Sequence, residues 1–127
     1  MARYNKGANA ERSLLADFWE KGFAVVRAAG SGGMTLPSPD LIALRKDKKY
    51  LLEAKAWKGN YLHLKNDQME ELKVWAKRSG CIPLIAWKIP HKGWRFLKIT
   101  QFNNGLKGYT INKEKALTKG KTLDEIT

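Results

Sequence analysis

The chain has 127 residues, 43% hydrophobic and 28% charged, so its length and composition predict a single domain able to bury an apolar core. Lys and Arg number 24 against 12 Asp and Glu, and the resulting net charge of +12 favours a polyanionic partner, nucleic acid before an anionic membrane surface. Cys81 is the only cysteine, which excludes an internal disulfide. The lack of a long apolar segment predicts an intracellular protein (cytoplasm or nucleoid) without signal peptide or transmembrane helix.

The first predicted element is a helix from about residue 5 to residue 21, because apolar residues recur at helical spacing. Glu11 precedes three of them by three, four and seven positions, so it is expected on the stripe that packs against a sheet. Gly22 is expected to end the helix in the left-handed conformation, with Phe23 folded back on Phe18. The apolar stripe consists of Leu14, Leu15, Phe18 and Trp19.

Five strands and a second helix are predicted next, with a loop rich in Gly and Pro between the first two strands. The order helix, three strands, helix, two strands predicts an α/β fold in which helices flank a mixed central β-sheet. Apolar density then falls, so residues 106–127 are expected to form a loosely packed tail of one domain spanning residues 1–127. The predicted strands are 23–30, 40–45, 50–57, 81–89 and 93–99, the loop is 31–39, and the second helix is 65–80.

Polar residues interrupt the hairpin formed by the strands at 40–45 and 50–57. A turn at residues 46–49, or at 47 and 48 alone, gives one and the same pairing, in which directly opposed residues share a face of the sheet. Asp40 then lies opposite Lys55, and Glu53 shares their face because it is two residues from Lys55. A slip of one residue would separate these side chains. The predicted pairs are Arg45 with Tyr50, Leu44 with Leu51, Ile42 with Glu53 and Asp40 with Lys55.

A patch of this kind favours a bound cation, because carboxylates gathered on a buried surface repel one another. Glu11, on the packed stripe of the first helix, adds a third carboxylate to Asp40 and Glu53. Carboxylate oxygens suit Mg²⁺, which polarises a phosphoryl group and lowers the pKa of a bound water. Lys55 would orient that water or stabilise charge on the phosphate. The pattern therefore favours metal-assisted hydrolysis of a phosphodiester over ATP chemistry, since no Gly-rich phosphate loop is present.

The spacing of Pro39-Asp40 and Glu53-Ala54-Lys55 resembles the signature of the PD-(D/E)XK nuclease superfamily. Flanking segments between residue 6 and about residue 99 are similar to the archaeal-type Holliday junction resolvases. These segments are "KGANAERSLL", "GFAVVRAAGS", "PDLIA", "LLEAKAW", "GCIPLIAWK" and "GWRF".

The resemblance implies a restriction-endonuclease-like core and a homodimeric endonuclease, dependent on Mg²⁺ with Mn²⁺ as an alternative, that cuts two opposed strands of a four-way DNA junction symmetrically. Its expected partners are branched DNA and a second copy of the chain, and no membrane. The matched catalytic positions are Glu11, Asp40, Glu53, Lys55 and Ser31, of which Glu11, Asp40 and Glu53 are the expected metal ligands. The expected DNA-binding positions are Lys6, Arg12, Arg27 and Ser31. Gln68 matches a supporting glutamine of related nucleases, and Ser38 is the alternative to Ser31 as the loop serine. A dimer interface is expected at Trp75 and Leu72, with Ile82, Leu84 and Trp87 as further candidates.

Other functions remain open at this point. One alternative is a different PD-(D/E)XK repair or restriction-type endonuclease that acts on ordinary duplex, and another is a non-catalytic DNA-binding module on the same fold. Structural roles also compete with the functional ones: Glu11 as an exposed helix acid, and Asp40 as a turn former. Arg27 is expected either to cap a carboxylate of the site or to extend outward to solvent. Three tryptophans are expected in the core rather than as base-stacking platforms; they are Trp57, Trp87 and Trp94.

Overall fold

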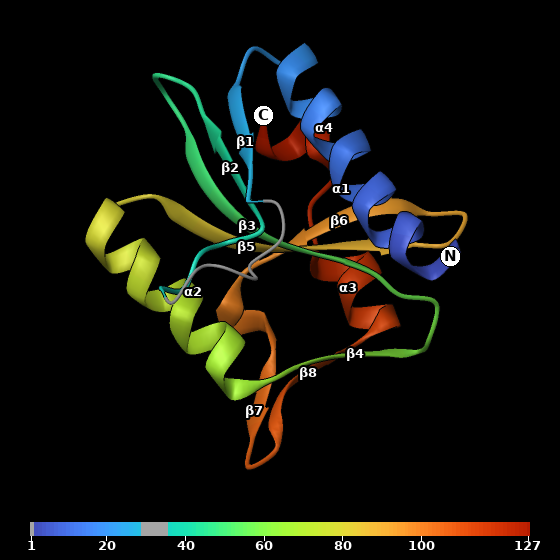
Figure 1. Ribbon diagram of the computed structural model, residues 1–127. Helices are drawn as coiled ribbons and strands as arrows, with labels where there is room; N and C mark the ends of the chain where they lie inside the picture. Colours follow the sequence, from blue (N-terminus) through green and yellow to red (C-terminus); the bar gives the residue numbers. More distant parts are fainter. Residues whose placement is uncertain (1, 29–35) are drawn as a thin grey trace.

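The computed structural model describes residues 2–28 and 36–127 (Figure 1), and for residues 2–6 it describes the backbone but not the side chains. Ser31 and most of the predicted loop therefore lie outside the described residues, as does the side chain of Lys6. Within the described part of the chain, no helix is both long and apolar enough to span a membrane. The helices are α1 (Ala2–Glu20), α2 (Asn66–Ser79), the short 3₁₀ helix η1 (Ile99–Gln101), α3 (Lys113–Lys119) and α4 (Leu123–Ile126). The strands are β1 (Ala24–Arg27), β2 (Leu41–Leu44), β3 (Lys49–Ala56), β4 (Tyr61–Leu64), β5 (Ile82–Ile89), β6 (Gly93–Leu97), β7 (Asn103–Gly105) and β8 (Gly108–Asn112).

The central sheet has the strand order β1-β2-β3-β5-β6, and a smaller sheet has the order β4-β8-β7. In the central sheet β3 and β5 are parallel while the other neighbours are antiparallel. A parallel pair needs a long crossover, and the segment containing β4 and α2 supplies it (Figure 1). The predicted α/β architecture, a mixed central sheet flanked by helices, is confirmed.

Two apolar cores lie on opposite faces of the central sheet. Successive side chains of a strand point to opposite faces, and the neighbours Leu51 and Leu52 accordingly belong to different cores. Leu52 packs with α1 and α4, whereas Leu51 packs with α2, α3 and the smaller sheet. We call these sides the α1 face and the α2 face (Figure 1).

The end of α1 follows the predicted pattern. Gly22 has a φ of 90° and its N–H donates to the carbonyl of Trp19, while the N–H of Phe23 donates to the carbonyl of Phe18. The rings of Phe18 and Phe23 meet edge to face, with centroids 5.2 Å apart. This helix end positions β1 beside β2, and so fixes one edge of the sheet.

The register of the β2–β3 hairpin differs from the predicted one by two residues. Ile42 lies opposite Leu51 and Leu44 opposite Lys49, because the turn is centred one residue earlier than predicted. Arg45 and Lys48 exchange backbone hydrogen bonds of 2.8 and 3.2 Å, which leaves only Lys46 and Asp47 at the tip. Since side chains alternate with a period of two, the shift keeps every residue on its predicted face. The predicted pairs were therefore wrong, but the predicted face of Glu53 and Lys55 was right.

The expectation of a loose tail at residues 106–127 is wrong. β8 pairs with β4, a strand that was not predicted, and Ile111 is almost completely buried. The hydroxyl of Tyr50 donates to the carbonyl of Ile126 at 2.6 Å, and Ile126 is itself buried. The segment has few apolar residues, but they are placed where both cores need them, and average apolar density does not reveal that placement.

Several expected interface residues are unavailable to a partner. Leu72 is only 1% exposed because it points into the α2-face core. Leu84 and Trp87 are also buried. Trp75 and Ile82 retain exposed surface, so of the expected interface residues only these two remain candidates.

Candidate active site beside β2 and β3

Asp40 lies just before β2 and is held against the neighbouring strand. Its Oδ2 accepts a hydrogen bond from the N–H of Ala54 at 3.0 Å, and its carbonyl accepts one from the N–H of Ala28 at 2.9 Å. The Asp40 side chain thus adds one more hydrogen bond between the two strands, beyond the first residue of β2. This bond fixes the Asp40 carboxyl next to Glu53, the residue that precedes Ala54 in β3.

Glu53 is the only charged residue that is buried among those the structure describes, with 8% of its surface exposed. Burial, followed by the negative charge of Asp40 and a hydrogen bond between the two carboxyl groups, raises the pKa of Glu53 from 4.5 to about 8. The positive charge of Lys55 acts in the opposite direction. Asp40 and Glu53 are therefore a close carboxyl pair that holds one proton at neutral pH when nothing else compensates the charge.

Lys55 follows Glu53 by two residues in β3 and so lies on the same side of the strand. The parallel ladder places Glu53 beside Ile85 and Lys55 beside Trp87, both of which belong to the α2-face core. Three of the predicted site residues, Asp40, Glu53 and Lys55, are thus brought together at the end of the hairpin opposite its turn.

Glu11 has a different partner. The Nε of Arg27 donates to Oε1 of Glu11 at 2.7 Å, and both side chains are about four-fifths buried. Arg27 is paired with Leu41, a residue of the α1-face core, so this ion pair lies on the side of the sheet covered by α1. Of the two roles considered for Arg27, the structure shows the pairing with a carboxylate.

The metal-ligand set can be tested against these positions. Over residues 2–28 and 36–127, no three His, Cys, Asp or Glu side chains gather closely enough to hold a metal ion together. Asp40 and Glu53 are the two predicted ligands whose carboxyl groups lie together. They fit a divalent cation, because the raised pKa of Glu53 shows that positive charge is favoured between them. Mg²⁺ commonly takes one or two carboxylates and completes its shell with water and substrate phosphate.

The remaining predicted residues lie around this centre. Arg12 is exposed on α1, and its guanidinium donates to the side chain of Asn9 at 3.4 Å. Gln68 accepts a hydrogen bond from the N–H of Lys65 at 3.1 Å and so caps the start of α2. Ser38 is half-buried in the segment that leads to Asp40.

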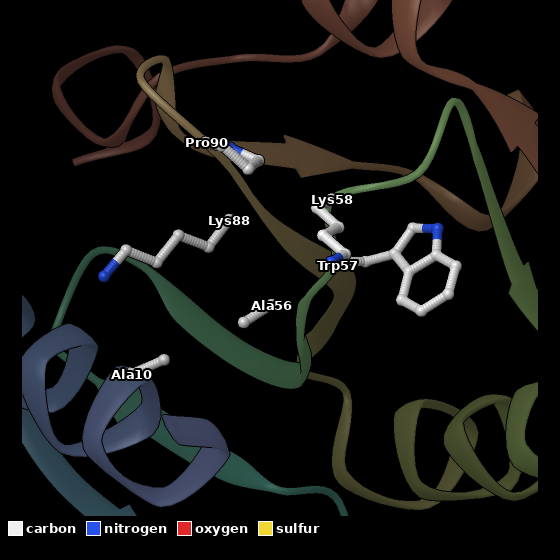
Figure 2. Close-up of a pocket in the computed structure, with 6 residues that line it drawn as sticks. All are labelled: Ala10, Ala56, Trp57, Lys58, Lys88 and Pro90. Atoms are coloured by element: carbon white, nitrogen blue, oxygen red, sulfur yellow. The ribbon is translucent and has the colours of Figure 1, made fainter. Parts of the chain in front are cut away.

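A cationic pocket lies on the α1 face beside Ala56, the residue that follows Lys55, and was missed by the sequence reasoning. It has a volume of about 210 Å³, and Figure 2 shows Lys88 and Lys58 at its rim with Ala10 and Ala56 between them. Lys88 is adjacent to Ala56 in the parallel β3–β5 ladder. The sequence did contain a signal, since Lys88 is the one charged residue of an otherwise apolar strand. That Lys88 lies beside Ala56, however, depends on a parallel strand pairing that local sequence patterns do not encode. The pocket is lined by Ala10, Ala56, Trp57, Lys58, Lys88 and Pro90.

Trp57 is also not the core residue that was expected. Half of its surface is exposed, whereas Trp87 is completely buried.

Comparison with known proteins places these features in one family. A family model described as "Archaeal holliday junction resolvase (hjc)" matches residues 2–126. The protein named crossover junction endodeoxyribonuclease Hjc from Archaeoglobus fulgidus is 35% identical over 86% of this chain and 80% of its own length. The protein of the same name from Sulfolobus acidocaldarius is 32% identical over 99% of this chain and 89% of its own length.

A solved structure agrees with the fold. The structure of Archaeoglobus fulgidus Hjc, titled a Holliday junction resolvase from an archaeal hyperthermophile, superimposes with a TM-score of 0.83 at 33% identity. The match covers 91% of this chain and 94% of that one. The predicted restriction-endonuclease-like core is thereby confirmed.

Proposed function

This chain belongs to the archaeal Holliday junction resolvase family and is an endonuclease, and we propose that it resolves four-way DNA junctions by Mg²⁺-dependent hydrolysis at a centre formed by Asp40, Glu53 and Lys55. The observation that carries this assignment is the pairing of the buried Glu53 with the half-buried Asp40, with Lys55 on the same side of β3. Two carboxyl groups that cannot both ionise cost folding free energy, which is understandable when they serve a cation. The single nuclease domain extends over the whole chain.

Each side chain of the centre has a separate task. When bound, the divalent cation supplies Lewis-acid polarisation of the scissile phosphate and lowers the pKa of a water. Asp40 and Glu53 hold the cation, and the hydrogen bond from Ala54 keeps Asp40 from turning away. Lys55 directs its ammonium group to the attacking water or to the phosphoryl oxygen on which charge develops.

Glu11 acts on the α1 face of the central sheet, whereas Asp40, Glu53 and Lys55 lie on the α2 face. Its carboxylate neutralises and orients Arg27, so that this guanidinium is held in one place beside the DNA path. A direct contact between Glu11 and the cation would require Glu11 to release Arg27. The pair thus links the two events, because a Glu11 that binds the cation leaves Arg27 free to contact a phosphate.

The DNA backbone follows the lysines and arginines around this centre. The net charge of +12 provides general attraction, and Arg12, Lys58 and Lys88 are exposed cations available for phosphate contacts. Phosphate contacts alone carry no base sequence, so the selectivity for a junction comes from the shape of the branched DNA. We place Lys6 and Ser31 on this path from the family pattern.

Symmetric cleavage of a two-fold junction calls for two centres related by a two-fold axis. The exposed apolar groove beside α2, about 390 Å³, is the surface that fits a second copy, and it includes Trp75, Val74 and Leu36. Trp75 is fixed there because its Nε1–H donates to the carbonyl of Pro37 at 2.5 Å. We therefore propose a homodimer formed through Trp75 and its exposed neighbours.

Incision of an end-labelled four-way junction, mapped on all four strands, tests the function. We expect Mg²⁺-dependent cuts at symmetry-related positions on two opposed strands, and much slower cutting of linear duplexes with the same arm sequences. Equal rates on the two substrates would favour an ordinary duplex endonuclease. Junction binding without incision in Mg²⁺ or Mn²⁺ would favour a non-catalytic module.

The dimer is tested by Val74→Asp, which places a charge in the apolar groove. Sedimentation should show a shift from dimer to monomer, because an unpaired carboxylate is costly in an apolar interface. Leu106→Asp is the matched control, since Leu106 is fully exposed on the turn between β7 and β8. A wild-type protein that sediments as a monomer would refute the homodimer.

A further inference from the structure

Trp57 stands out among the residues near the centre because it is both exposed and rigidly held. We propose that its indole is a stacking platform for a nucleobase at the branch point of the junction, beside the scissile phosphate. This inference rests on the proposed function and adds a residue that recognises the open structure of the DNA.

The position of Trp57 follows from the strand. Glu53, Lys55 and Trp57 are alternate residues, and the N–H of Trp57 still donates to the carbonyl of Lys88 at 3.4 Å, so the β3–β5 ladder reaches Trp57. Alternation therefore puts the indole on the same side as Lys55. Figure 2 agrees, since the indole points away from Ala10 and Lys88, which belong to the α1 face. Two residues of a strand span roughly 7 Å, a distance comparable to one or two nucleotides of a DNA strand.

The indole is held by hydrogen bonds and by close packing. Its Nε1–H donates to the carbonyl of Tyr61 at 2.7 Å, and the carbonyl of Trp57 accepts from the indole N–H of Trp87 at 2.9 Å. A Cβ atom at Gly59 would lie 2.6 Å from Nε1 of Trp57, so the turn can pass this close only because residue 59 is glycine. A ring fixed in this manner loses little conformational entropy when a ligand stacks on it.

The exposure of Trp57 has a cost that a stacked base would offset. Half of its surface remains in water, which forgoes roughly 2–3 kcal/mol of apolar burial. Stacking of a nucleobase on an aromatic side chain is worth about 1–3 kcal/mol. The free energy lost by exposing Trp57 and the free energy gained by stacking are similar, so a stacked base can offset the cost of the exposed ring.

The surroundings favour a nucleobase over an apolar protein partner. Trp57 lies between Lys55, two residues before it, and Lys58, which follows it directly, and both are positively charged. Lysines next to an aromatic residue suit nucleic acid, because they neutralise phosphates while the ring takes a base. Base stacking is interrupted at the branch point of a four-way junction, so a base face becomes available there without any requirement on sequence.

Junction binding by Trp57→Ala tests the inference, measured without metal so that no cleavage occurs. We expect affinity for the junction to fall roughly 5- to 100-fold, as the loss of one stacked base predicts. Trp57→Phe should retain most of the affinity, and binding of linear duplex should be unchanged in both variants. Trp19→Ala is the matched control, because Trp19 is 65% exposed on α1 but lies near its C-terminal end. Unchanged junction binding by Trp57→Ala would overturn the inference.

A second measurement uses the wild-type protein and does not depend on how the variants fold. 5-Bromouracil placed at the branch point should crosslink to Trp57 under ultraviolet light, and the same base placed within an arm should not. Crosslinks at the branch point that never include Trp57 would also overturn the inference. Failure of the wild type to cut junctions would instead refute the proposed function, so the two failures are distinguishable.

Discussion

The two ends of the β2–β3 hairpin treat charge in opposite ways. At the turn, Arg45 pairs with Asp47 at 2.7 Å, lies over the ring of Phe23, and donates to the carbonyls of Lys21 and Thr127. At the far end, the carboxyl groups of Asp40 and Glu53 are held together, and the burial of Glu53 disfavours charge on both of them at once. The turn end ties the C-terminus to the sheet and serves stability, whereas the far end gives up stability for a cation site.

Glu53→Gln should give the largest effect, because it removes a proposed metal ligand while preserving the shape of the side chain. We expect junction cleavage to fall by roughly 100- to 1,000-fold or more, a loss typical of a group that stabilises transition-state charge. The free energy of unfolding should not fall, since the amide removes the conflict with Asp40. Strand-mapped cleavage rates and urea unfolding measure the two quantities.

Glu71→Gln is the matched control for this substitution, because Glu71 is an exposed residue of α2. It should leave both cleavage and stability unchanged. Normal cleavage by Glu53→Gln would contradict the claim that this end of the hairpin is the catalytic centre.

The stability of the metal-free protein should depend on pH through Glu53. The pKa of Glu53 is about 8 in the folded protein against an ordinary value of 4.5, so between these values the folded state holds a proton that the unfolded state has released. The free energy of unfolding therefore falls as pH rises through this window, by up to about 1.4 kcal/mol per pH unit. This contribution is constant below the window and above it.

Urea unfolding between pH 4.5 and 8 in the presence of a chelator measures this slope. The difference between wild type and Glu53→Gln isolates the contribution of Glu53, and added Mg²⁺ should flatten the wild-type curve. Parallel curves for the two proteins would show that the carboxyl pair carries no such conflict.

Tyr50→Phe tests the turn end, because it removes only the hydroxyl that binds the carbonyl of Ile126. We expect a loss of about 1–2 kcal/mol in the free energy of unfolding, the usual cost of leaving a buried carbonyl without its donor. Cleavage at a temperature where the variant is folded should match the wild type. A large loss of activity without a loss of stability would mean that the two ends are not separate in function.

Glu11→Gln should give the smallest effect and distinguishes the two roles of this residue. Removing the charge frees Arg27 for phosphate contact, so metal-free junction binding should strengthen by about 2- to 5-fold, which corresponds to the modest energy of a partly exposed ion pair. Filter binding at several salt concentrations measures it. Weaker binding would mean that Glu11 is needed to position Arg27 rather than to neutralise it.

The candidate site shows how far sequence patterns reach. Glu53 and Lys55 were placed on one face from the period of two alone, and a register error of two residues did not disturb that result. Glu11 was expected on the packed stripe of α1, and its side chain is indeed largely buried. Its partner is Arg27, however, because the pairing of β1 with β2 brings that side chain to the α1 face.

The residues that were missed depend on contacts between distant segments. Lys88 lies beside Ala56 through the parallel pairing of β3 with β5, and the turn at Gly59 passes close beside the ring of Trp57 and helps to hold it. The tail was misjudged for the same reason, since β8 finds its partner in β4, more than forty residues earlier.

The amino-acid sequence by itself determined the charge of the protein, the principal helices and strands, and the face of β3 that carries the carboxylate and the lysine. These features depend on composition and on neighbours a few residues apart, and local patterns record such relations. Only the tertiary structure decided which cation meets which carboxylate, which tryptophan remains in water, and how the C-terminal segment packs. Those outcomes depend on strand pairing and core packing between distant parts of the chain, where many arrangements satisfy the same local pattern and only the packed whole selects one.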